Sequence, residues 1–332
     1  MKRFYIGLLI LLCCSISAPA TAQKRLVDKL TIPAILKELF KDKPENQYFA
    51  RSPYPFCIKA RYSTTLSIIG MEWKENESSY SIISEPIFKI GAHFSYRGLG
   101  LGFQKDIKKF TGGNAKDNTE FNASAHGRIV GGDFSYRTQK NYSINKYNDN
   151  ELKKELGGMN SKNIYANGYY VFNNKKFSYP AAITQSYRQK KSCGSVIAGL
   201  SFYYNKFNFN PEEFPSDTKG TEQYIKYLFG YSLNINAGYA YNWVINEQWM
   251  LHGSLLPYIP IIKSAKYETD DTSIKLKRGF GIGCNGRIGV QWNYEHHSAN
   301  FTALVYLNNL SNKPLGFTDF YNRIQISYGY RF

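Results

Sequence analysis

Large apolar side chains occupy almost every second position at the C-terminal end of the chain. Over residues 323–332 the alternate positions are arginine, glutamine, serine or glycine. A period of two is typical of a β-strand, because successive side chains point to opposite faces of a sheet. The apolar face consists of Phe320, Ile324, Ile326, Tyr328, Tyr330 and Phe332. The pattern predicts a final strand that ends on an aromatic residue.

The same alternation recurs along most of the chain and predicts eleven further strands. Residues 227–243 carry apolar side chains at odd positions, and residues 280–294 carry them mainly at even positions. The other predicted strands lie at about 58–69, 87–97, 99–105, 119–128, 130–139, 161–172, 193–209, 248–262 and 297–308. With the C-terminal strand, the total is twelve.

An alternating strand can belong to a soluble sandwich or to a membrane barrel, and two features favour the barrel. The apolar faces bear aromatic residues near both strand ends, and the opposite faces carry charge along their length. Lipid accepts an apolar face, closure satisfies the backbone, and a lumen accepts polar residues. Runs of about 9 to 11 residues also match a tilted membrane strand. We therefore expect an all-β fold, a closed antiparallel transmembrane β-barrel of about twelve strands.

The N-terminus has the pattern of a secretory signal peptide. Lys2 and Arg3 precede an apolar run at residues 4–14, and small residues follow up to Ala22. This order predicts cleavage after Ala22 and export to the outer membrane of a Gram-negative bacterium. Leu12 before Cys13 fits a lipoprotein signal poorly, so no lipid anchor is expected.

Three domains follow from this division: a signal peptide at 1–22, a periplasmic segment at 23–56 and the barrel at 57–332. Apolar residues at roughly helical spacing around Pro33 predict a periplasmic helix or a small plug for the second of these. A poorly ordered tether is the alternative.

Charge and composition narrow the class of partner. The formal charge of +17 becomes +15 when the signal, with two positive and no negative residues, is removed. For an exported protein this balance favours anionic lipids or solutes over nucleic acid. Aromatic residues make up 16% of the chain, which suits a protein that displays them at two membrane interfaces. The mature cysteines, Cys57, Cys193 and Cys284, have no C-x-x-C spacing, so no disulfide framework, zinc site or cofactor is expected.

Loop lengths predict the topology. With both barrel termini in the periplasm, the outer loops fall at 70–85, 106–118, 140–160, 210–223, 263–275 and 309–318. Forward and backward counts agree only if residues 173–192 do not cross the membrane. The alternative is that this segment forms half of a hairpin and another predicted strand is wrong. We expect a periplasmic element that folds towards the lumen as a gate or docking segment, with Lys175, Lys176, Tyr179, Gln185, Arg188, Lys190 and Lys191 as its candidate residues.

If the apolar faces contact lipid, the opposite faces line the lumen, and basic residues exceed acidic ones there. A water-filled lumen of this sign would favour anions. The sequence therefore predicts a channel for small anionic or polar solutes. The alternative is a plugged structural or docking barrel in which the same charges pair with one another. The predicted lumen-lining residues are Lys59, Arg61, Lys89, His93, Arg97, His126, Arg128, Asp133, Arg137, Arg287, Glu295, Arg323 and Arg331.

No enzyme is expected, although one catalytic pattern was weighed. Outer-membrane phospholipases place a His-x-Ser pair on one face of a strand. His296 with Ser298 has this spacing, and so does His93 with Ser95, which indicates chance recurrence. A lipid hydrolase remains a remote alternative. The glycine runs at 98–102 and 279–283 are interpreted as small lumen-facing residues in strands and not as nucleotide loops.

Two stretches resemble known families. The terminal "SYGYRF" resembles the last strand of Gram-negative outer-membrane proteins, in which the final Phe is recognised by the barrel-assembly machinery, so Phe332 is the candidate assembly signal. The block "YYVFNNKKFSYPAAITQSYRQKKSCGS", with "FSYRGLGLGF", resembles a secreted barrel family named domain of unknown function 4421, from about residue 50 to the C-terminus. The resemblance implies an outer-membrane barrel and brings no activity. The expected partners are outer-membrane lipids and lipopolysaccharide, the assembly machinery and a small anionic solute.

Overall fold

The computed structural model describes residues 46–73, 78–109, 118–147, 150–213, 225–269, 272–276, 281–310 and 315–332. The predicted signal peptide at 1–22 and the part of the 23–56 segment before residue 46 lie outside these residues.

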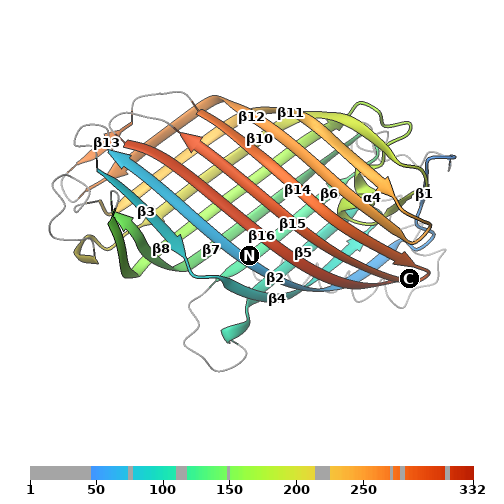
Figure 1. Ribbon diagram of the computed structural model, residues 1–332, viewed down its shortest axis with the longest axis horizontal. Coiled ribbons are helices and arrows are strands. Elements are labelled where there is room, and N and C mark those ends of the chain that lie inside the picture. The colour runs from blue at the N-terminus through green and yellow to red at the C-terminus, as the bar shows by residue number, and fades with distance from the viewer. Residues whose placement is uncertain are drawn as a thin grey trace, which may run out of the picture. The chain divides into compact units, whose positions relative to one another are not determined.

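Twelve antiparallel strands form a closed ring (Figure 1). Each strand pairs with its neighbour in the chain, and the last strand pairs with the first through residues 315–331 and 57–73. The predicted all-β barrel and its twelve strands are confirmed. The ring strands are β2 (Phe56–Trp73), β4 (Ile87–Tyr96), β5 (Leu99–Asp106), β6 (Thr119–His126), β7 (Val130–Tyr147), β8 (Asn150–Val171), β10 (Cys193–Asn208), β11 (Tyr227–Val244), β12 (Trp249–Glu268), β14 (Gly281–Tyr294), β15 (His297–Leu310) and β16 (Leu315–Arg331).

The two ends of the barrel differ. The inner end holds Phe56 and Phe332, whose backbones bond to each other, together with the short turns between strands. At the β4–β5 turn, Arg97 and Gly98 both have positive φ, at 47° and 91°. An added Cβ at Gly98 would lie 2.4 Å from the carbonyl oxygen of His126, so glycine is needed there. The outer end carries the long connections, as expected for a barrel with periplasmic termini.

Several strands extend further at the outer end than the alternation predicted. Within residues 140–160, expected as a loop, β7 continues to Tyr147 and β8 begins at Asn150, and the two strands pair there. Residues 70–85, also expected as a loop, contain the end of β2 and a separate strand, β3 (Ser79–Ser84). β3 pairs with β2 on one side and β7 on the other, and so closes the wall beyond the shorter strands β4, β5 and β6. A three-residue strand, β13 (Ser273–Lys275), pairs antiparallel with the end of β12.

Residues 173–192 form no part of the ring, in agreement with the topology prediction. They contain a one-turn helix, α4 (Tyr179–Ile183), and β9 (Tyr187–Gln189). β9 pairs with β1 (Phe49–Arg51), which precedes the barrel. Two short 3-10 turns, η1 (Ile107–Lys109) and η2 (Pro211–Glu213), lie outside the strands. Over the described ranges, no helix has both the length and the apolar character that a membrane crossing requires.

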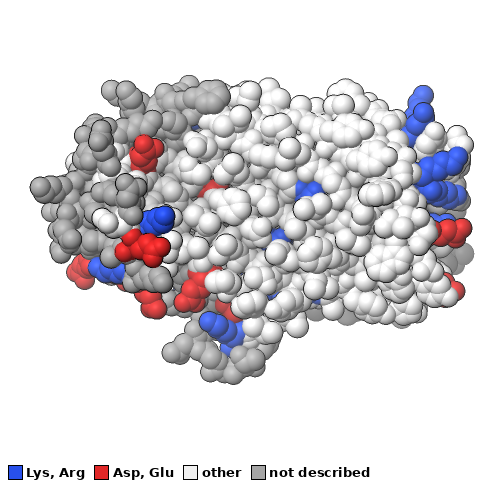
Figure 2. All heavy atoms as spheres, in the orientation of Figure 1, with Lys and Arg blue, Asp and Glu red and all other residues white. Residues whose placement is uncertain are grey.

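The outer surface of the ring is apolar. In β11, for example, the odd-numbered Tyr231, Ile235 and Tyr239 are exposed, while the even-numbered Asn234 and Asn236 are fully buried. Figure 2 shows charged side chains gathered mainly at the two ends, with a broad and mostly uncharged band between them. This band, on a closed ring, is the lipid-facing belt of a transmembrane barrel.

Candidate functional site in the barrel interior

An apolar cluster fills the outer end of the barrel interior. On β2 the inward-facing side chains change from polar at Ser63, Thr65 and Ser67 to apolar at Ile69 and Met71. The cluster is fully or almost fully buried and includes Ile69, Met71, Trp73, Tyr80, Ile82, Tyr142, Ile144, Leu156, Phe207, Leu228, Tyr267, Leu315 and Phe317. Close packing of this kind leaves little room for water between these side chains.

Residues 173–192, the inner segment, occupy the inner end of the lumen. Phe177 is fully buried, and with Tyr179 it packs against Val171, Ile197 and Leu256 of the wall. Ala181 and Ala182 pack against Met250. Burial raises the pKa of the Tyr179 hydroxyl, which therefore stays protonated.

Polar side chains of the wall bind the main chain of the inner segment. Lys59, which is 2% exposed, donates to the carbonyl of Thr184 at 3.2 Å and to Oε1 of Gln185 at 2.7 Å. Gln291 donates to the carbonyl of Ala182 at 2.9 Å. Asn242 donates to the carbonyl of Ser178, also at 2.9 Å. These bonds reach the segment from β2, β14 and β11, and they satisfy carbonyls that a helix of one turn leaves without partners.

Asn242 also belongs to a chain of polar contacts with His252 and Ser254. Oδ1 of Asn242 lies 2.8 Å from Nδ1 of His252, and Nε2 of His252 lies 3.3 Å from Oγ of Ser254. This is the order of orienter, base and hydroxyl found in serine hydrolases. The hydroxyl, however, is covered by the inner segment, because the Tyr179 ring lies 5.5 Å from the His252 ring and Tyr179 interacts with Ser254. His252 and Ser254 have the same His-x-Ser spacing in the sequence, but this pair was not among the predicted candidates.

The two His-x-Ser pairs weighed from the sequence are not arranged in this way. His296 lies in the turn after β14 and its Nδ1 contacts the carbonyl of Arg331, while Ser298 donates to Gly329. Ser95 donates to the carbonyl of Cys57. Within the described part of the chain, neither serine contacts the histidine two residues before it.

A polar chamber lies between the inner segment and the outer apolar cluster. Its cavity has a volume of about 70 Å³, and Ile183 and Thr184 of the inner segment form part of its lining. A second cavity of about 30 Å³ shares Asp133, Tyr165 and Arg287 with it. The charged residues on the chamber wall are Arg61, Glu120, Asp133, Arg137, Arg287 and Arg323.

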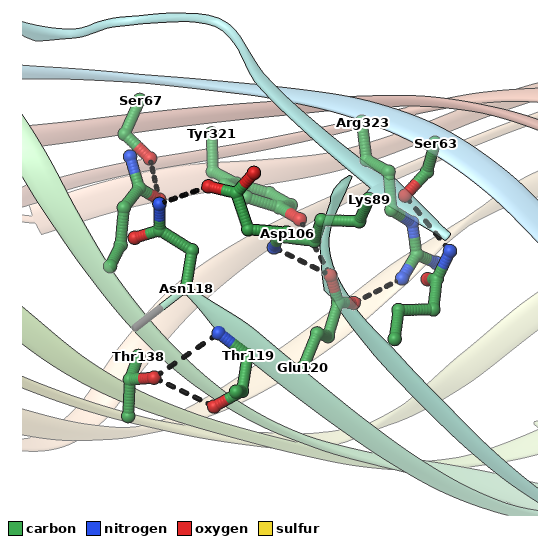
Figure 3. Close-up of polar contacts among 12 residues, drawn as sticks. Ser63, Ser67, Lys89, Asp106, Asn118, Thr119, Glu120, Thr138, Tyr321 and Arg323 are labelled. Carbon is green, nitrogen blue, oxygen red and sulfur yellow. Dashed lines mark hydrogen bonds and ion pairs between the residues drawn. The ribbon is translucent and has the colours of Figure 1, made fainter. Parts of the chain in front are cut away.

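Glu120 is the most heavily paired residue of the chamber. Lys89 lies 3.2 Å from its Oε2, Arg323 binds its Oε1, and Tyr321 donates to Oε2 at 3.4 Å. Figure 3 shows these side chains converging on the carboxylate. Asp133 is also paired, since its Oδ1 lies 3.1 Å from Nε2 of His126. Both carboxylates are therefore occupied by cations or histidine of the wall.

Three arginines of the chamber have no carboxylate partner. Among the described residues, Arg61 and Arg287 make no hydrogen bond or ion pair, and Nε and Nη1 of Arg137 lack an acceptor. The guanidinium carbon of Arg137 instead lies 3.5 Å from the centre of the Tyr321 ring. With four arginines and two carboxylates on the wall, two positive charges are in excess.

Glycines on β5 make room for the side chains of Arg61 and His93. An added Cβ at Gly102 would lie 2.8 Å from Nη1 of Arg61, and one at Gly100 would lie 2.6 Å from Nε2 of His93. Gly100 and Gly102 are thus small lumen-facing residues of β5, as interpreted from the sequence, whereas Gly98 lies in the preceding turn.

Most of the predicted lumen residues face the interior. Arg61, Asp133, Arg137, Arg287 and Arg323 line the chamber, and Lys59, Lys89, His93 and His126 are buried around it. Arg331 faces inward at the inner rim, where it donates to the carbonyl of His297. Arg128 also lies at the inner end and donates to the carbonyl of Asn174.

The prediction that Arg97 and Glu295 line the lumen is wrong. Arg97 and Glu295 are exposed at inner turns, where both have positive φ. The two-residue alternation ends where the chain reverses, so it cannot place a turn side chain in the lumen.

The candidate gate residues divide into two sets. Tyr179 and Gln185 are buried in the barrel, and Lys190 is partly buried. Exposed at the inner end are Lys175, Lys176, Arg188 and Lys191. The segment thus presents apolar and amide groups to the lumen and basic groups to the outside of the inner end.

The sequence reasoning did not single out Glu120, Tyr321 or Gln291. Glu120 occupies an inward-facing position of β6, so its alternation could have identified it. No group of His, Cys, Asp and Glu able to hold a metal ion occurs among the residues that the structure describes.

Comparison with known proteins gives one family and a set of barrels. A family model described as "Domain of unknown function (DUF4421)" matches residues 41–332. No curated protein matches the chain. The outer membrane protease OmpT from Escherichia coli is similar with a TM-score of 0.41 and 10% identity, over 85% of this chain and 98% of that chain.

Two other solved structures are similar. The translocator domain of the autotransporter NalP from Neisseria meningitidis has a TM-score of 0.35 and 12% identity, over 94% of this chain and 98% of that one. The toluene transporter TodX of Pseudomonas putida has a TM-score of 0.33 and 8% identity, over 85% and 91%. Likenesses of this size bear on neither site nor activity.

Proposed function

We propose that this chain, which belongs to the domain of unknown function 4421 family, is an outer-membrane barrel with a gated pathway for small anionic or polar solutes. The inner segment is the gate and is closed at rest. The observation that carries the proposal is the position of this segment: it lies inside the ring, directly below a chamber with unpaired arginines.

The way in which the inner segment is attached supports a gate. It joins β8 to β10, which are neighbours in the ring, so it can leave the lumen without separating any ring strands. β1, which pairs with β9, would move with the segment. Much of its attachment consists of single hydrogen bonds from Lys59, Gln291 and Asn242 to main-chain or amide oxygens. In the open state water would satisfy these groups, so breaking these bonds adds only a moderate free-energy cost to opening.

A non-conducting structural or docking barrel is the second candidate. The apolar cluster at the outer end favours it, because a continuous water-filled path would have to cross Ile69, Ile82 and Phe317. The exposed lysines and Arg188 of the inner segment would then be a docking surface for an anionic partner.

Conductance in a planar bilayer with a salt gradient separates the two. Ala182, 2% exposed under Met250, is replaced by aspartate, since a buried unpaired carboxylate should expel the inner segment. Ser192→Asp adds the same charge at an exposed position of the segment and is the control. We expect the wild type and the control to be nearly silent and Ala182→Asp to give anion-selective steps.

Silence of the Ala182→Asp protein over many insertions would reject the pathway and favour the structural barrel. The variant must first be shown to fold. An unboiled sample of a folded barrel migrates on a gel at a different position from a boiled sample. A variant that does not fold is replaced by Ala181→Asp, whose parent side chain is equally buried.

A further inference from the structure

We infer that the chamber binds one small oxyanion, such as phosphate, sulfate or a carboxylate, between Arg61, Arg137 and Arg287. These residues come from β2, β7 and β14, so the site would be assembled only when the ring is closed. The inference rests on the proposed function only for the route by which the ion reaches the chamber.

Buried guanidinium donors of the chamber outnumber the acceptors within hydrogen-bond reach. Arg137 is 6% exposed and Nε and Nη1 of its guanidinium lack an acceptor, and Nε of Arg61 is also buried without one. A buried donor without an acceptor destabilises the folded protein, and a bound acceptor removes that cost. Neither Glu120 nor Asp133 accepts a hydrogen bond from Arg61, Arg137 or Arg287 among the described residues: Lys89 and Arg323 bind Glu120, and Asp133 lies 3.1 Å from Nε2 of His126.

The chamber also carries an excess of positive charge. Arg61 is close enough to Arg323 and Arg287 to be repelled by both. Asp319 attracts Arg137 and Lys89 lies beside Glu120, so Lys89 and the four arginines face three carboxylates, Glu120, Asp133 and Asp319, and two positive charges stay in excess. Water can satisfy the donors, but it cannot neutralise two excess charges away from bulk solvent. An anion does both.

The geometry of the guanidinium groups and the size of the cavity both suit a small oxyanion. Guanidinium groups bind carboxylate and phosphate oxygens through two parallel hydrogen bonds, which a spherical halide cannot accept. A cavity of about 70 Å³ has room for several water molecules or one such ion. Gly102 keeps this space open, because a side chain there would collide with the guanidinium of Arg61.

The test is anion binding by the mature protein refolded in detergent. Thermal stability is measured with increasing phosphate, sulfate or succinate, and with chloride at matched ionic strength. We expect a saturable rise in melting temperature with at least one of the three oxyanions and none with chloride. Phosphate or sulfate alone would indicate a tetrahedral inorganic ion, and succinate alone would indicate a carboxylate.

The variants are Arg61→Gln and Arg287→Gln, with Arg97→Gln as a control that removes an arginine outside the chamber. Affinity should fall about tenfold or more in the first two and stay unchanged in the control. Gly102→Ser, which crowds Arg61 without changing charge, should also weaken binding. If Arg61→Gln does not fold, Arg61→Lys keeps the charge and loses the paired geometry.

Absence of a saturable effect of any oxyanion on the wild type would overturn the inference, as would an equal loss in Arg97→Gln. Failure of the proposed function gives a different result. If the wild type binds an oxyanion but Ala182→Asp does not conduct, the anion site is supported and the pathway is rejected. If Ala182→Asp conducts but the wild type binds no oxyanion, the pathway is supported and the anion site is rejected.

Discussion

Replacing Lys59 by methionine tests how firmly the gate is closed. Lys59 is buried, and its two hydrogen bonds go to the carbonyl of Thr184 and Oε1 of Gln185. Methionine is similar in length and removes both bonds and the charge. In the closed state the two oxygens of the inner segment then lose their donor, while in the open state water supplies one.

The magnitude follows from these contacts. Each hydrogen bond from a charged donor is worth about 1.5 to 3 kcal/mol. Burial of the ammonium costs several kcal/mol and offsets part of this gain. A net loss of about 2 kcal/mol of closing free energy is a reasonable figure, and it corresponds to a rise of roughly 30-fold in the ratio of open to closed protein.

The assay is single-channel recording of Lys59→Met in a planar bilayer, with open probability as the quantity compared. Lys175→Met is the matched control, because it removes a lysine from the exposed side of the same segment. An open probability of Lys59→Met equal to that of the wild type would refute the latch. So would an equal increase in Lys175→Met, since the effect would then come from charge alone.

Three further predictions concern assembly, packing and catalysis. Deletion of Phe332, whose backbone bonds to Phe56 and whose ring lies 5.5 Å from the Phe56 ring, should lower the yield of heat-modifiable barrel in membranes; an unchanged yield would remove its role as an assembly signal. Ile82→Ala, in the apolar cluster, should destabilise the barrel by about 2 to 5 kcal/mol in denaturant titrations, while Ile90→Ala on the lipid face should cost less, and equal losses would contradict the packing described. A fluorophosphonate should label neither Ser254 nor Ser298, because the inner segment covers the first and no histidine activates the second; labelling of Ser254 that is lost in His252→Gln would instead indicate a hydrolase.

The local pattern of the sequence was sufficient to predict the strands. Alternation fixes which side chains face lipid, and it placed Lys59, Arg61, Lys89 and Arg323 on the inner face. It failed at Arg97 and Glu295, because a tight turn breaks the period. It also failed beyond Ile69, because there the inward face becomes apolar as well, and residues 70–85 and 140–160 then lack the contrast that marks a strand.

The contents of the lumen could not be predicted in this way. The bond between Lys59 and Gln185 joins residues 126 positions apart in the chain, and the bond between Arg323 and Glu120 joins residues 203 apart. Such contacts depend on the ring closing with one particular register. The basic character of residues 173–192 indicated that they avoid lipid, but only the closed ring shows which side chains of the segment lie inside.

The seam between β2 and β16 has a consequence for how the chain reaches its final form. Every other neighbouring pair in the ring joins strands that follow one another closely, whereas this pair joins opposite ends of the barrel sequence. Contacts between distant residues form slowly, because the entropy of closing the loop must be lost first. Until the last strand arrives, β2 presents an unpaired edge with Ile58 and Tyr62 on its apolar face, which is a template for association with other chains. A chain truncated anywhere before β16 should therefore aggregate instead of forming a smaller barrel.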